Sequence, residues 1–153
     1  MTTPLPEFDL AGFTPYRLAV AAEKTSEALA RQYRERFGIS IPEWRVLVHL
    51  AQPLDGRSTV SVRDIEARVA MEKSKVSRAA SRLEAAGYIE KAADAGDRRL
   101  VRLALTDKGH ALMAELLPLA KAYQEELERR LGDTLADFEA GLDRLLDTLP
   151  PKS

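Results

Sequence analysis

The residues best suited to chemistry lie in the middle of the chain, on a predicted helix between residues 72 and 86. One stripe of this helix is apolar at the three- and four-residue spacing of a buried face, with Val76, Ala79, Ala80 and Leu83. The opposite face carries Lys73, Ser74, Lys75, Ser77, Arg78, Ser81 and Arg82. Lysine and arginine donate to guanine edges or phosphates, and short serines let a helix approach the major groove closely. This pattern predicts a DNA-recognition helix, with a merely solvated helix face as the alternative.

A basic hairpin is predicted directly after this helix. Residues 88–91 and 100–105 have the composition and alternation of short strands, and the loop between them is charged. Arg98 and Arg99 lie in that loop, where arginines can enter a narrow minor groove. Asp94 and Asp97 lie beside these arginines, so we expect them to stay ionised and to serve in turns and ion pairs rather than in acid–base catalysis.

The distribution of charge supports a nucleic-acid partner, although the formal net charge is −1. Eleven basic and seven acidic residues lie between Arg57 and Arg102, whereas the remainder of the chain has twelve basic and seventeen acidic residues. A basic middle with acidic flanks is expected if only the middle meets phosphate.

Several classes of function have no support in the sequence. The chain has no cysteine, which excludes thiolate metal sites, disulfides and a cysteine nucleophile. His49 and His110 are far apart, so a metal site is not expected. No phosphate loop, nucleophile elbow or cofactor fingerprint is found, and we expect no enzyme. Neither a secretory signal nor an apolar run of roughly 18 residues is visible, so we expect a cytoplasmic protein without membrane contact.

Helix signals place further elements around the basic middle. Thr14 is the expected N-cap of a helix that runs to about residue 37, where Gly38 ends it. Capping boxes at residues 40–43 and 61–64 predict helices over 42–51 and 61–69, with residues 53–57 as a turn between them. Thr106 is expected to cap a helix over 107–131, which Pro118 should kink, and Thr134 to start a last helix that ends before Pro150.

These elements predict a mainly α fold with a small β-hairpin wing. Residues 40–105 form the expected winged helix-turn-helix lobe within a single chain of residues 1–153. Residues 10–38 and 107–149 carry apolar stripes that one chain has little left to cover, so we expect them to be dimerisation helices that pack against a second copy.

Several motifs in this order resemble the MarR family of bacterial and archaeal regulators. They are Ser40-Ile-Pro-Glu-Trp-Arg-Val-Leu47, Lys73-Ser-Lys-Val-Ser-Arg78, Arg82-Leu-Glu84, Gly87-Tyr-Ile89, Asp94-Ala-Gly-Asp-Arg-Arg99 and Leu105-Thr-Asp-Lys-Gly109. The resemblance extends from about Tyr16 to Leu149, and the wing motif followed by Leu-Thr-x-x-Gly is its most specific part. It departs from the family at Met71, a poor N-cap, although Glu72 favours a helix start there.

The resemblance implies a winged-helix homodimer that binds an inverted-repeat site in double-stranded DNA. It further implies repression that a small, often aromatic, ligand relieves. By position it assigns the contacting face to Ser74, Lys75, Ser77 and Arg78, and the wing contacts to Arg98 and Arg99. Asp97 is expected to brace the wing, because a carboxylate facing phosphate is repelled. Arg82 is expected to contact phosphate or to pair with Glu84 or another acid.

Three aromatic or basic residues outside this face are candidates for binding the ligand. Tyr16 and Arg17 can line a pocket from the first helix, although packing at the dimer seam is the more common use of such residues. Trp44 can stack on a ligand or lie in the core. The rival function is a winged-helix module that docks an acidic protein and does not bind DNA.

Overall fold

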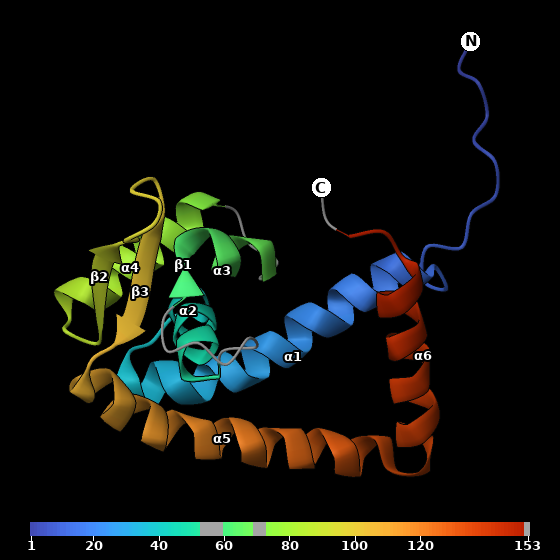
Figure 1. Ribbon diagram of the computed structural model, residues 1–153. Helices are drawn as coiled ribbons and strands as arrows, with labels where there is room; N and C mark the ends of the chain where they lie inside the picture. Colours follow the sequence, from blue (N-terminus) through green and yellow to red (C-terminus); the bar gives the residue numbers. More distant parts are fainter. Residues whose placement is uncertain (53–59, 69–72, 152–153) are drawn as a thin grey trace.

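Three long helices and a small α/β lobe make up the molecule, of which the computed structural model describes residues 1–52, 60–68 and 73–151. In chain order the elements are α1 (Thr14–Phe37), α2 (Ile41–Ala51), β1 (Val60–Ser61), α3 (Val62–Arg68), α4 (Lys73–Ala85), β2 (Ile89–Ala93), β3 (Val101–Leu105), α5 (Asp107–Leu131), the 3-10 turn η1 (Gly132–Thr134) and α6 (Leu135–Thr148). The lobe contains α2 to β3, and α1, α5 and α6 extend from it as the sides of an open triangle (Figure 1). The predicted turn at 53–57 and the residues Met71 and Glu72 lie outside the described residues.

Local capping explains most helix ends. Gly38 ends α1 with a positive φ of 68°, a conformation that glycine adopts without strain. Ser61 and Asp64 cap α3 reciprocally, because each backbone amide donates to the other residue's side chain, at 3.3 and 3.0 Å. The expectation for Thr14 was wrong by one residue. Phe13 is the N-cap of α1, since its carbonyl already accepts the amide of Arg17 at 3.0 Å.

The core lies inside the lobe and under the lobe-facing halves of α1 and α5. The apolar stripe predicted for the recognition helix is buried there, with Val76, Ala79, Ala80 and Leu83. It packs in one cluster with residues from α1, α2, α3, the sheet and α5, among them Tyr33, Leu47, Ile65, Leu103 and Leu116. Burying this stripe fixes which face of α4 remains in solvent.

The sheet has three strands where the sequence predicted a two-stranded hairpin. The strand order is β1-β3-β2 and both pairings are antiparallel. Val60 lies opposite Leu103 on one side of β3, and Lys91 lies opposite Leu103 on the other. Strand β1 has only two residues, which is too short to show the alternation by which strands are recognised in a sequence.

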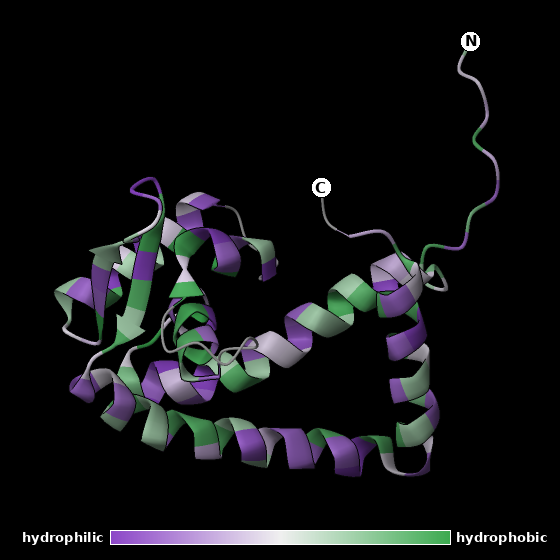
Figure 2. Ribbon diagram, in the orientation of Figure 1, coloured by the Kyte–Doolittle hydropathy of each residue, from purple (hydrophilic) through white to green (hydrophobic). Residues whose placement is uncertain are grey.

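The C-terminal helices have the predicted bounds. Helix α5 spans the predicted residues 107–131 and continues through Pro118 as one 25-residue helix, and Thr134 is the N-cap of α6, which follows directly on η1. Helix α6 has no buried residue, and Figure 2 shows apolar segments along α1 and α6 that lie away from the lobe. No helix in the described ranges has the length and apolar character needed to cross a bilayer.

Candidate nucleic-acid interface

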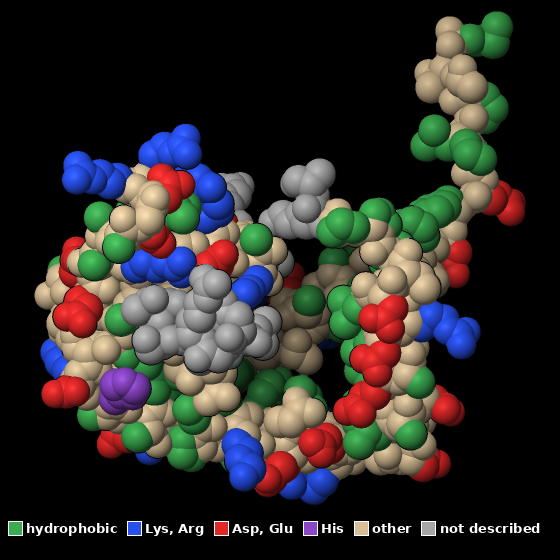
Figure 3. All heavy atoms as spheres, viewed as in Figure 1, with side chains coloured by type: hydrophobic (Ala, Val, Ile, Leu, Met, Phe, Trp, Pro, Cys, Tyr) green, Lys and Arg blue, Asp and Glu red, His purple; other side chains and the backbone are tan. Residues whose placement is uncertain are grey.

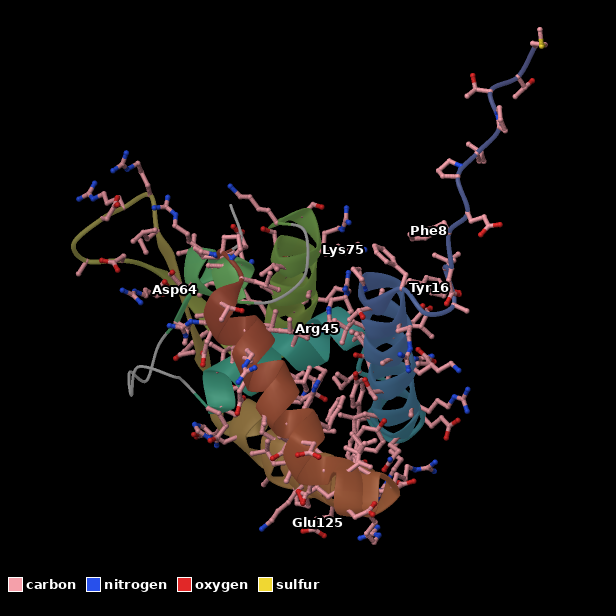
Figure 4. All side chains as sticks on the ribbon, turned by 90° about the vertical axis from the view of Figure 1, so that its right-hand side faces the viewer. Phe8, Tyr16, Arg45, Asp64, Lys75 and Glu125 are labelled. Atoms are coloured by element: carbon pink, nitrogen blue, oxygen red, sulfur yellow. The ribbon has the colours of Figure 1, made fainter. Side chains whose placement is uncertain are left out.

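The polar face of α4 is exposed to solvent. Seven of its side chains are exposed, namely Lys73, Ser74, Lys75, Ser77, Arg78, Ser81 and Arg82. The labelled Lys75 in Figure 4 lies toward the side of the lobe on which the wing also projects. The structure therefore brings together on one side the residues that the sequence assigned to DNA contact.

The wing loop is organised by Asp94 at its base. One carboxylate oxygen, Oδ1, accepts the backbone amides of Gly96 and Asp97 at 2.7 and 3.2 Å. The other, Oδ2, accepts Nε of Arg102 at 2.8 Å. The Arg102 hydrogen bond and the two amides hold the pKa of Asp94 below its ordinary value, because all three favour the charged carboxylate.

At the tip, Asp97 holds Arg99 while leaving its guanidinium open to a partner. Oδ1 of Asp97 accepts the backbone amide of Arg99 at 3.0 Å and its Nε at 3.2 Å. The Arg99 side chain is nevertheless 87% exposed, and Arg98 beside it is also exposed. Figure 3 shows basic side chains gathered at this end of the lobe. Both arginines can therefore contact an anionic surface without any rearrangement of the core.

Arg102 joins the wing to α3, a role that the sequence analysis missed. Besides its bond to Asp94, its Nη1 lies 3.8 Å from Oδ2 of Asp64. The hydrogen bond from the Ser61 side chain, together with the Ser61 amide and nearby arginines, lowers the pKa of Asp64. The alternation of β3 predicted only that Arg102 is on a half-exposed strand. Its two partners come from segments eight and thirty-eight residues away, which no local pattern connects.

A hollow of about 290 Å³ separates α4 from the wing and adds two basic residues to the interface. Arg63 of α3 and Lys91 of β2 line it together with Lys73 and Arg99. Lys91 donates to Oγ of Ser81 at 3.1 Å and lies 3.8 Å from Glu84. The excess of basic residues over residues 57–102 was the sequence signal from which Arg63 and Lys91 could have been added to the predicted DNA-contacting residues.

Arg82 has an acidic partner that the sequence did not name. Its Nε lies 3.5 Å from Oε1 of Glu43, whose carboxylate also accepts the Ser40 hydroxyl at 2.8 Å. This contact ties α4 to the start of α2. About half of the Arg82 side chain stays exposed, so a phosphate contact remains a prediction.

Within one chain, the candidate ligand residues do not form one pocket. The ring of Trp44 stacks on that of Tyr33 at 5.4 Å, where α2 meets the C-terminal part of α1. Tyr16 and Arg17 lie at the opposite end of α1, and the 17 residues from Tyr16 to Tyr33 span about 25 Å of helix. Burial raises the pKa of Tyr33 to about 12, so this phenol is neutral beside Trp44.

In the part of the chain that the structure describes, no three acidic or histidine residues gather as a metal site would require. The ring nitrogen Nδ1 of His49 instead lies 2.6 Å from the carbonyl oxygen of Arg45, one turn earlier in α2.

A helix pair, a three-stranded sheet with a basic wing and flanking long helices together define a winged helix-turn-helix protein. The profile of the MarR family matches residues 37–100. A MarR family transcriptional regulator from Silicibacter pomeroyi DSS-3 is 32% identical, with 94% of this chain and 100% of that chain covered and a TM-score of 0.79. The chain belongs to the MarR family of transcriptional regulators, which confirms both the resemblance and the fold class.

Two further relatives bear on function. The regulator TtmR of Methylorubrum extorquens (strain PA1) is 29% identical over 132 residues, which are 84% of this chain and 64% of TtmR. The chain spans 50% and 64% of the length of the curated relatives that it matches. BpsR of Bordetella bronchiseptica, whose DNA binding is regulated by 6-hydroxynicotinic acid, shares the fold at 21% identity, with 95% of this chain and 100% of that chain covered and a TM-score of 0.76.

Proposed function

We propose that two copies of this protein bind one inverted-repeat site in double-stranded DNA as a repressor, and that a small, aromatic ligand releases them. The observation that carries the proposal is the joint exposure of the α4 polar face and the wing arginines on one side of the lobe. Such a pairing matches a duplex, because a helix fills the major groove while a basic wing reaches the adjacent minor groove.

In the proposed complex, some of the serine and basic side chains contact base edges and others contact the DNA backbone. Ser74, Lys75, Ser77 and Arg78 are placed to meet base edges and phosphates from α4. Lys73 lies at the start of α4, and Arg63 and Lys91 line the hollow beside it. In the proposed complex these three residues contact the sugar–phosphate backbone of the DNA. Arg98 and Arg99 act in the minor groove, and Asp97 orients Arg99 through the two hydrogen bonds described above.

Two copies follow from the apolar faces that one chain leaves uncovered. Leu146 of α6, Leu149 directly after α6 and Leu18 of α1 are exposed, which favours burial against a partner. A two-fold axis presents two α4 helices to one side, and successive major grooves are about 34 Å apart. The matching DNA site is therefore an inverted repeat.

Control by a ligand is supported by the fold shared with BpsR, whose DNA binding is regulated by 6-hydroxynicotinic acid. Because Tyr16 lies at the start of α1 and Trp44 of α2 packs against the far end of that helix, a ligand that touches both needs Tyr16 or Arg17 from one copy and Trp44 from the other. In this proposal the protein acts in the cytoplasm and represses transcription while it is bound to DNA.

The test is a gel shift with the DNA that flanks the gene encoding this protein. We expect a complex that weakens steeply with salt, because lysine and arginine displace counterions from DNA. Arg78→Ala and Arg99→Ala should each weaken it by roughly 5- to 150-fold, corresponding to about 1–3 kcal/mol. Arg129→Ala removes the same charge from an exposed site on α5 and serves as the control.

A complex that tolerates both substitutions as well as it tolerates Arg129→Ala would refute the assigned interface. The absence of any salt-sensitive complex, together with capture of an acidic protein partner, would favour the protein-docking alternative instead.

A further inference from the structure

Glu66 of α3 places a negative charge in the basic hollow between α4 and the wing. It lines this hollow together with Arg63, Lys73, Lys91 and Arg99, and no other acid of the described ranges does so. The DNA contacts proposed above give these basic residues a role and leave Glu66 without one. A carboxylate at the place where a phosphate backbone is expected therefore needs its own explanation.

The carboxylate of Glu66 also has no partner within the described part of the chain. Its Oε1 is buried and accepts no hydrogen bond, and the side chain takes part in no salt bridge. The other acids of this surface each have a basic partner: Glu43 with Arg82, Glu84 with Lys91 and Asp97 with Arg99. A buried acceptor without a donor costs stability, so Glu66 is not explained by a contribution to the fold.

The packing of α3 holds Glu66 at this position. Ile65, its neighbour in the helix, is fully buried in the core, and α3 contacts both α4 and β3. The rest of the lining includes apolar side chains, namely Val62, Ala80, Leu100 and Val101. Apolar surroundings screen a charge less than water does, so the carboxylate acts more strongly here than on an open surface.

We propose that Glu66 is an affinity-limiting residue, whose carboxylate repels the DNA phosphates that the basic residues of the hollow attract. The inference rests on the proposed DNA binding and adds to it a residue that weakens the complex. Because phosphates are the same in every duplex, the repulsion acts equally on operator and unrelated DNA. Glu66 thus sets how tightly the protein holds DNA, and the preference for one sequence is left to α4.

Limited affinity has two consequences for a regulator that a ligand releases. A ligand shifts an equilibrium only by its differential affinity for the two states, so a less tightly bound repressor is released by a smaller differential. Unrelated DNA also competes for the protein at a very large number of sites. A charge that opposes backbone binding reduces the fraction of protein retained at those sites.

A positioning role is the alternative, in which Glu66 orients neighbouring basic side chains toward the phosphate. The two roles predict opposite effects of removing the charge. If Glu66 repels phosphate, DNA binding becomes tighter without the charge. If Glu66 orients Lys73 or Lys91, DNA binding becomes weaker, because these side chains lose the group that directs them.

The test is the affinity of Glu66→Gln, which keeps the size of the side chain and removes its charge. Fluorescence anisotropy at about 50 mM salt should show a dissociation constant roughly 3- to 10-fold below that of wild type, for operator and for an unrelated duplex of equal length. The difference should narrow at about 200 mM salt, because salt screens the repulsion. Glu66→Asp retains the charge and should show no such gain.

Glu115→Gln is the matched control, because it changes the net charge of the chain by the same amount. Glu115 is exposed on α5, which lies on the side of the lobe away from the wing (Figure 1). We expect Glu115→Gln to bind DNA as wild type does. Circular dichroism checks that the variants keep their helix content, and Glu66→Ala, which removes the charge with the side chain, should change affinity in the same direction as Glu66→Gln.

Three results would overturn the proposal: Glu66→Gln binding no more tightly than wild type, a gain confined to operator DNA, or an equal gain in Glu115→Gln. If wild type forms a salt-sensitive complex with DNA and one of these results is found, only the inference about Glu66 fails. If wild type forms no such complex, the proposed function fails with it.

Discussion

Arg102 of β3 donates through Nε to Asp94 at 2.8 Å, while its Nη1 lies 3.8 Å from Asp64 at the start of α3. One guanidinium is therefore hydrogen-bonded to the base of the wing and lies within ion-pair distance of the first helix of the helix-turn-helix. Because α3 packs on α4, this linkage sets the position of the wing relative to the recognition helix. Together with the loop amides that Asp94 accepts, it gives the charged loop a defined orientation, which lowers the ordering cost of binding.

Asp94→Asn should weaken DNA binding about tenfold while leaving the overall helix content unchanged. The amide lacks the charge that holds Arg102, and a hydrogen bond to a charged group contributes more than a neutral one. Fluorescence anisotropy with the operator measures the affinity, and circular dichroism measures the helix content. Asp133→Asn, an exposed carboxylate in η1, is the matched control. Equal affinities for the two variants would show that the wing needs no such anchor.

Acid should destabilise the protein through Asp64 and Asp94. Hydrogen bonds in the folded state lower the pKa of both carboxyl groups, so the unfolded chain binds protons more readily. Their contribution is complete above the unfolded value of about 4 and is lost as pH falls through the lower folded values. Urea unfolding at pH 5, 4 and 3 checks this, and Asp64→Asn/Asp94→Asn should show a shallower loss. The same slope in wild type and variant would contradict it.

Gly109→Ala should destabilise the fold by about 1–3 kcal/mol or more. A Cβ at this position would collide with the carbonyl oxygen of Tyr88, which also accepts the amide of Thr106 at 3.1 Å. Gly141→Ala is the informative comparison, because nothing lies within 4 Å of the position that its Cβ would take on α6, and alanine favours a helix by about 0.5–1 kcal/mol. Thermal unfolding should therefore move in opposite directions for the two variants, and a shift in the same direction would count against this interpretation.

Tyr33 should titrate at about pH 12, well above an ordinary tyrosine, because it is buried against Trp44. The raised pKa means that its contribution to stability is complete below pH 10 and is lost as pH rises from 10 towards 12. Ultraviolet difference titration of wild type and Tyr33→Phe isolates this phenol. The Tyr33→Phe variant should also lose less stability than wild type above pH 10. If the two proteins have the same titration curve near pH 12, the raised pKa does not belong to Tyr33.

The sequence by itself determined the parts of this protein that depend on neighbours along the chain. The capping residues at Ser40, Ser61 and Thr106 fixed helix starts, because their side chains bond to amides three residues later. The spacing of Val76 and Leu83 fixed which face of α4 is buried, and hence that Lys75 and the residues around it remain in solvent.

Only the tertiary structure decided the contacts between distant segments. The pairing of β1 with β3, the Arg102 linkage to Asp64 and the Arg82 contact with Glu43 all join residues more than thirty positions apart. The separation of Tyr16 from Trp44 likewise follows from how α1 lies against the lobe. A periodic pattern states which side of an element is apolar, but only packing selects the element that covers it, because many partners would bury the same area equally well.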